Sequence, residues 1–181
     1  MRRRYAAAAA AVLMLAVAGA AFAATRDGAG NATVKTIEEV KMVPNKYIQD
    51  GVHFAPGTVT VASGGTLTFE YGDKEQEPHT LTVVPKSGLP KTAAQAENCA
   101  ACQKYATPHL KNPKAPPDEH NPIVHWTLSK GNPGFDTVGD SLAIQPGAHK
   151  KINVKVTAPA GTTLYFVCAV HPWMQGKIVV K

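Results

Sequence analysis

The stretch CAVHPWMQGKIVV, residues 168–180, decides how this chain is interpreted. It places a thiol, an imidazole and a thioether at Cys168, His171 and Met174, three residues apart, directly before a new alternating apolar segment. Steps of three around a tight loop can turn all three side chains to one side. Gly176 suits the sharp re-entry, because glycine tolerates a positive φ. The loop is therefore a candidate metal site with one nitrogen and two sulfur ligands.

Segments in which apolar and polar residues alternate flank this loop and recur from about residue 52 onward. Successive side chains of a strand point to opposite faces, so such segments have one buried and one wetter face. Turns rich in glycine and proline separate them. The clearest segments are 58–61, 66–70, 79–83, 151–156, 164–168 and 177–180. Six strands, with one or two more in ambiguous stretches such as 34–50, predict an all-β fold, an antiparallel Greek-key β-sandwich.

Residues 85–140 break this pattern. Residues 92–105 are rich in alanine and could form a short helix, whereas residues 106–122 hold five prolines and are typical of irregular loop. The segment is too poor in apolar residues to build a core of its own. We therefore expect one domain over 46–181 that carries a long loop and short-helix insertion at about 85–140.

The first residues are typical of an export signal. Three arginines follow Met1, an apolar run continues to about Ala21, and Ala21-Phe22-Ala23 is a small-x-small cleavage site. We expect a signal peptide over 1–23, a leader over 24–45, and a mature protein in the periplasm or outside the cell. The alternative, a membrane anchor, is disfavoured because the run is short for a span and no second apolar run follows.

Charge gives little indication of a partner. Lys and Arg number 19, and three of them leave with the signal peptide, so 16 remain against 13 acidic residues and the mature net charge is +3. The lysines are scattered, which argues against nucleic acid. A slight preference for an acidic protein partner is all that this charge supports, and we expect a monomer.

A second imidazole is available at His79, which opens a strand and shares a face with Leu81 and Val83. A histidine on such a face can also be a hydrogen-bonded core residue, but the loop with Cys168 favours a ligand. Two imidazoles, a thiolate and a weak thioether are the ligand set of blue copper. We expect His79, Cys168, His171 and Met174 to hold one copper ion that cycles between Cu(I) and Cu(II). Four protein ligands leave no position for a substrate, so we expect no enzyme.

The loop and its exit, CxxHPWMxGKIVV, resemble the cupredoxins, the type 1 blue copper proteins, and the short spacings are most similar to amicyanin. Plastocyanin and pseudoazurin keep the order with a longer His-to-Met gap. The resemblance covers roughly 46–84 and 141–181. It implies an electron-transfer protein of the cell envelope with a redox donor and acceptor, and an electron port where Pro172 and Trp173 flank His171. The family often has Asn after its first histidine, where this chain has Thr80.

Two other hypotheses about the function of the copper site remain. A storage or delivery protein would use the same ligands with exchangeable metal. An accessory copper domain would dock on a larger oxidoreductase. The sequence alone does not separate these from a free electron carrier.

Cys99 and Cys102 form a second motif. Covalent haem would need histidine at position 103, which is Gln, and a zinc site would need two further ligands. We favour a disulfide, because helical residues three apart have Cα atoms roughly 5 Å apart. The remaining histidines are expected on the surface or in loops: His53, His109, His120, His125 and His149.

Overall fold

The computed structural model describes residues 30–72, 77–115 and 120–181. The expected signal peptide, residues 1–23, and the first part of the expected leader lie outside this range. Among the described residues, no helix is both long and apolar enough to cross a membrane.

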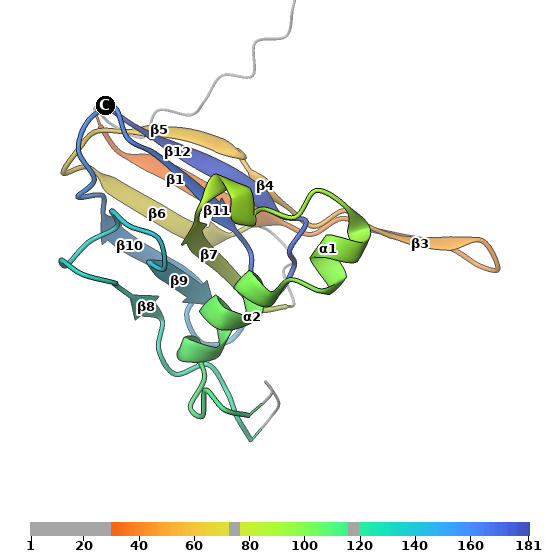
Figure 1. Ribbon diagram of the computed structural model, residues 1–181. Coiled ribbons are helices and arrows are strands. Elements are labelled where there is room, and N and C mark those ends of the chain that lie inside the picture. Colours follow the sequence, from red (N-terminus) through yellow and green to blue (C-terminus); the bar gives the residue numbers. More distant parts are fainter. Residues whose placement is uncertain (1–29, 73–76, 116–119) are drawn as a thin grey trace, which may run out of the picture.

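Two β-sheets pack face to face, so the predicted β-sandwich is confirmed (Figure 1). The smaller sheet has the order β10–β6–β1–β4, with β1 (Ala32–Ile37), β4 (His53–Ala55), β6 (Thr66–Tyr71) and β10 (Lys151–Lys155). The larger has the order β5–β12–β11–β7–β9–β8, with β5 (Thr58–Val61), β7 (His79–Val84), β8 (Thr127–Leu128), β9 (Ser141–Ile144), β11 (Thr163–Val167) and β12 (Gln175–Val180). The chain crosses between sheets repeatedly, as from β6 to β7 and from β9 to β10, in the manner of a Greek-key sandwich.

Not every ladder follows the antiparallel order that the sequence predicts. β1 pairs in parallel with β6, and β5 pairs in parallel with β12. β1 also falls inside the expected leader, so the leader 24–45 is wrong as a boundary and the sandwich includes residues from Ala32 onward. After β1, the chain forms a separate exposed hairpin of β2 (Val40–Val43) and β3 (Tyr47–Asp50).

The core lies between the sheets and comes from the alternating positions. Phe54 is central, with its ring 6.2 Å from that of Phe69 and 5.0 Å from that of Phe166, both in edge-to-face arrangements. Aromatic pairs prefer this geometry, and such large side chains contribute much of the apolar burial that stabilises a sandwich. The core continues to Cys168 and Met174, so it reaches the candidate metal loop.

The insertion covers the part of the larger sheet's outer face that β7 and β9 form, and both strands are fully buried. Its short helices are η1 (Lys86–Gly88), α1 (Ala93–Glu97), α2 (Ala100–Ala106) and η2 (Thr107–His109). On this outer face, Cys99 and Cys102 pack with Val84 and Val167. Every residue of β7 is buried as a result, on the outer as well as the inner face of the sheet. The outward hydroxyls of β7 are buried as a result, and buried hydroxyls need hydrogen-bond partners.

Candidate metal centre

Residues 168–174, here called the 168–174 loop, join β11 to β12 at one end of the sandwich. These strands are antiparallel neighbours, with Val167 opposite Gln175. The amide of Cys168 donates to the Met174 carbonyl over 3.0 Å, and the amide of Met174 donates to the His171 carbonyl over 2.9 Å. These two bonds close the loop on itself, which turns its ligand side chains inward.

His79 reaches the same point from the neighbouring strand. It is the first residue of β7, and Leu81 and Val83 follow it on the inner face of the sheet. β7 lies beside β11 in the larger sheet, so the beginning of β7 meets the end of β11. Topology therefore brings together side chains that are 89 residues apart in the sequence, those of His79 and Cys168.

Three donor atoms form a compact buried triangle. The Sγ of Cys168 lies 3.8 Å from Nδ1 of His79 and 3.8 Å from Nδ1 of His171, and the two nitrogens are 3.2 Å apart. The three side chains are 0%, 1% and 5% exposed for Cys168, His79 and His171. Polar atoms this close and this buried, all able to bind one ion, indicate a metal centre.

The triangle has the dimensions that a transition metal requires. A point in its plane lies about 2.0 Å from each nitrogen and about 2.3 Å from the sulfur, which are ordinary metal–imidazole and metal–thiolate lengths. His79, Cys168 and His171 would hold such an ion through two imidazole nitrogens and one thiolate sulfur. Zinc sites usually have four strong ligands, whereas two histidines and one cysteine with a weak further ligand are the donor set of type 1 copper.

Met174 ends the loop and is 1% exposed. It belongs to the same buried cluster as Cys168, so its side chain points into the molecule at this end of the core. That position is consistent with the expected axial thioether, and Met174 remains a predicted ligand.

The close contacts within the triangle shift the pKa values of Cys168 and His171. Burial raises the pKa of the Cys168 thiol, but hydrogen bonds and charge from His171 and His79 outweigh it and lower that pKa from 9.0 to about 6. Burial lowers the pKa of His171, but the thiolate and Glu77 outweigh it and raise that pKa to about 8. The amides of Thr80 and His171 also donate to Sγ, each over 3.4 Å. The metal-free site therefore holds a thiolate at neutral pH, the form that binds metal.

Glu77 is a contact that the sequence did not predict. Its Oε2 lies 2.7 Å from Nε2 of His171, so the carboxylate accepts from the ring nitrogen that faces away from the triangle. A histidine ligand with such a partner has a fixed tautomer and orientation. An acidic residue two positions before His79 was the one available signal, and nothing in the sequence placed it against the second histidine.

Glu77→Gln should lower the pKa of His171 in the metal-free protein from about 8 toward its ordinary value of 6.5. The variant removes the charge but keeps the side-chain shape. The thiolate of Cys168 remains, so the pKa should stay above the ordinary value. NMR titration of the His171 ring measures it, and an unchanged pKa would mean that Glu77 does not interact with the ring in solution.

Thr80 supplies the bond between the two ligand segments. Its Oγ1 accepts from the amide of Ala169 over 2.7 Å, while its own amide donates to Cys168 Sγ. Thr80 thus places a hydroxyl where the cupredoxins, which the sequence resembles, often have the amide side chain of Asn. The contact ties β7 to Ala169, the residue that follows Cys168.

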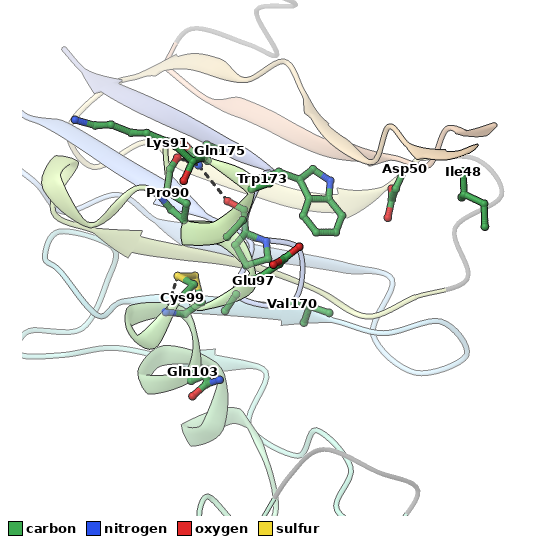
Figure 2. Close-up of a pocket in the computed structure, with 16 residues that line it drawn as sticks. Ile48, Asp50, Pro90, Lys91, Glu97, Cys99, Gln103, Val170, Trp173 and Gln175 are labelled. Atoms are coloured by element: carbon green, nitrogen blue, oxygen red, sulfur yellow. Dashed lines mark hydrogen bonds between the residues drawn. A yellow bond between two sulfur atoms is a disulfide. The ribbon is translucent and has the colours of Figure 1, made fainter. Parts of the chain in front are cut away.

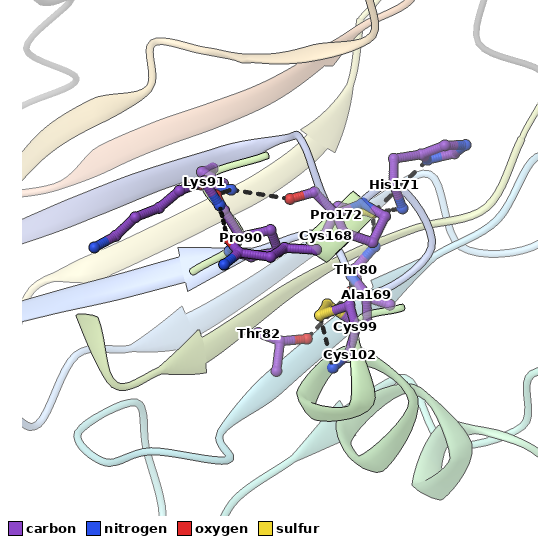
Figure 3. The surroundings of a disulfide bond; sticks show 12 residues. Thr80, Thr82, Pro90, Lys91, Cys99, Cys102, Cys168, Ala169, His171 and Pro172 are labelled. Atoms are coloured by element: carbon purple, nitrogen blue, oxygen red, sulfur yellow. Dashed lines mark hydrogen bonds between the residues drawn. A yellow bond between two sulfur atoms is a disulfide. The ribbon is translucent and has the colours of Figure 1, made fainter. Parts of the chain in front are cut away.

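Cys99 and Cys102 form a disulfide with a Cα–Cα distance of 5.1 Å, and Cys168 is the free thiol. The bond caps α2 beside the 168–174 loop, where Ala169 packs against its cluster (Figure 3). Gln175 adds a second link, because its Nε2 donates to the carbonyls of Pro90 and Pro172. The insertion is thus joined to the 168–174 loop by packing and by hydrogen bonds.

A cleft of about 990 Å³ opens beside the loop (Figure 2). Trp173 borders it and is 46% exposed, with Pro172 and Val170 beside it on the loop. Ile48 and Asp50 of β3 and residues of α1 line the other sides. The predicted port residues Pro172 and Trp173 therefore lie at an accessible face next to His171, whose ring is 5.3 Å from that of Trp173.

One histidine differs from its expectation. His53, His120, His125 and His149 are exposed, whereas His109 is 1% exposed, so its predicted surface position is wrong. It is buried because η2 folds back onto β8 and β9, where Nε2 of His109 lies 2.7 Å from Ser141 Oγ. The proline-rich sequence around it gave no sign of this packing.

Neither a scan of family models nor a search of curated proteins finds a match for the chain. Similar solved structures include a purple cupredoxin from Nitrosopumilus maritimus, 12% identical over 83% of this chain and 99% of that one, with a TM-score of 0.42. They also include auracyanin A, a blue copper protein from Chloroflexus aurantiacus, 21% identical over 84% and 100%, with a TM-score of 0.41. A third is plastocyanin from Dryopteris crassirhizoma, 17% identical over 83% and 100%, with a TM-score of 0.39.

Proposed function

We propose that this chain is a type 1 blue-copper electron carrier of the cell envelope, with copper held by His79, Cys168, His171 and Met174. The observation that carries the proposal is the buried triangle of two imidazole nitrogens and one thiolate sulfur. Its donor set favours copper, and bound copper supplies one-electron cycling between Cu(I) and Cu(II).

The protein's own contribution is a fixed, dry site. All three triangle residues are buried, and β7, β11 and the closed loop hold them from separate backbone segments. A site that changes little in shape between oxidation states needs little rearrangement when an electron arrives or leaves. This favours a carrier over a catalyst, whose metal would need an open position for its substrate.

The first experiment is the visible absorption and EPR spectrum of the protein after addition of one equivalent of Cu(II). We expect an intense thiolate-to-copper band with narrow copper hyperfine splitting. A colourless protein with an ordinary tetragonal signal would contradict the proposal, because Cys168 would then not be bound. That result would favour copper storage or delivery.

Copper binding should release about one proton at pH 7. With a pKa of about 8, His171 is mostly protonated at that pH, whereas Cys168, with a pKa of about 6, is mostly thiolate. Metal displaces the imidazole proton, so the apparent affinity should fall by about tenfold for each pH unit between the pKa of His171, about 8, and that of Cys168, about 6. Calorimetry in two buffers of different ionisation enthalpy counts the protons, and an affinity that does not change between pH 6 and 8 would contradict the expectation.

Trp173 and Pro172 are proposed as the docking face for protein partners. Trp173→Ala should slow electron self-exchange between two copies of the protein by about tenfold, because an exposed aromatic side chain often dominates a contact face. NMR line broadening in mixtures of oxidised and reduced protein measures the rate. The absorption spectrum serves as the control and should not change, and an unchanged rate would show that electrons pass elsewhere.

A further inference from the structure

A line of buried polar groups runs from the insertion to the 168–174 loop. Nε2 of His109 lies 2.7 Å from Ser141 Oγ, which lies 2.7 Å from Thr82 Oγ1. Thr82 Oγ1 lies 3.1 Å from Thr80 Oγ1, and Thr80 Oγ1 accepts from the amide of Ala169. All four side chains are at most 2% exposed. These groups are thus shielded from bulk solvent, and the low local dielectric strengthens each contact.

Strand register and the insertion together build this line. Thr80 and Thr82 occupy the outer face of β7, and Thr82 sits directly opposite Ser141 of β9. In an open sandwich this face would meet solvent. Here the insertion covers it, and His109 of η2 supplies the partner at the far end.

The ring of His109 is held in one orientation. Its Nδ1 contacts the carbonyl oxygen of His125, which can only accept, so Nδ1 carries the proton. Burial lowers the pKa of His109, and the ring is therefore neutral at pH 7. A neutral ring with its proton on Nδ1 leaves Nε2 as an acceptor for the hydroxyl of Ser141. The far end of the line is thereby fixed by the backbone of the insertion.

We propose that His109, Ser141 and Thr82 are positioning residues that hold the Thr80 hydroxyl against the Ala169 amide, so that the insertion sets the geometry of the metal loop. Thr80 contacts the loop at the residue after Cys168, and its amide contacts Cys168 Sγ. A displaced Thr80 would change both contacts. The effect on the copper rests on the proposed function, whereas the effect on the loop does not.

Thr82→Val tests the line with little change in volume, and Thr82→Ser is the matched variant that keeps the hydroxyl. The first readout is amide hydrogen exchange of the metal-free protein. The rate at Ala169 is divided by that at Val156, whose amide donates to Gly65 in a distant part of the sandwich. We expect Thr82→Val and Ser141→Ala to raise this ratio by about tenfold, the factor for loss of one hydrogen bond worth about 1.4 kcal/mol. Thr82→Ser should leave it near that of the parent.

Asn121→Ala controls for simple loosening of the insertion. Asn121 is buried there, and its side chain bonds to Asn112 and Ala115, neither of which belongs to the line. We expect Asn121→Ala to lower the free energy of unfolding, while the ratio of the exchange rates at Ala169 and Val156 stays unchanged. An unchanged ratio in Thr82→Val, or an equal rise in Asn121→Ala, would overturn the proposal.

The second readout is the reduction potential of the copper-loaded protein. It should shift in Thr82→Val and His109→Leu and stay at the parent value in Thr82→Ser and Asn121→Ala, because loss of packing alone does not alter the donors around sulfur. Equal potentials in all variants would show that the line does not reach the metal. If the parent forms no blue copper site, the proposed function fails, and the exchange ratio still decides whether the line positions the loop.

Discussion

Cys168→Ser should abolish the intense thiolate-to-copper absorption and weaken copper binding by more than about 100-fold. Loss of a group that merely orients a ligand costs 10 to 100-fold in affinity, and Cys168 would be the one soft, anionic ligand of the set. The hydroxyl of serine is neutral at pH 7, so it cannot replace a thiol whose pKa the two histidines lower to about 6. Absorption and EPR during copper titration measure both effects.

The double variant Cys99→Ser, Cys102→Ser is the matched control. It removes the two other cysteine sulfurs and leaves the triangle of His79, Cys168 and His171 in place. We expect it to keep the blue band, although the cluster around Val84 and Val167 loses its disulfide. A blue band that survives in Cys168→Ser would overturn the ligand assignment, and one that disappears in the control would mean that the disulfide is needed to shape the site.

The strands that follow a period of two could be predicted because the burial of each face is written in the local sequence. Val59 and Val61 are buried where Thr58 and Thr60 are exposed, as the alternation indicates. The parallel pairings of β1 and β5 could not be predicted in this way, because each depends on which distant strand offers its edge. Residues around Val34 were ambiguous for the same reason.

The metal centre was accessible to sequence analysis because three of its four proposed ligands share one short loop and the fourth opens an alternating strand. The contacts around it were not. Thr80 and Thr82 occupy the polar positions of β7, which the pattern assigns to a wetter face, and the insertion buries them. Glu77 and His109 act across the fold, so their roles follow from the packing of segments that the local pattern leaves irregular.

Gly176→Ala should lower the free energy of unfolding by about 3 kcal/mol, the upper part of the usual range for overpacking a core. The sequence suggested a positive φ at this position, and that reason is wrong: Gly176 lies within β12, and its φ is not among the positive values. A methyl group there would overlap the ring of Phe166 and lie 2.5 Å from the carbonyl oxygen of Gly57. Neither neighbour can yield, since Phe166 is fully buried and the Gly57 carbonyl accepts from the Lys177 amide.

Gly57→Ala separates this close approach from the general effect of replacing glycine. A methyl group at Gly57 would meet only ordinary contacts, 3.6 Å from the Gln175 carbonyl and 3.8 Å from that of Phe54. We expect this variant to change the free energy of unfolding by less than about 1 kcal/mol, because alanine restricts the unfolded chain without straining the fold. Urea unfolding of the metal-free proteins measures both variants. Equal stabilities would mean that the ring of Phe166 moves aside, and the loop exit would then tolerate a side chain next to the metal ligands.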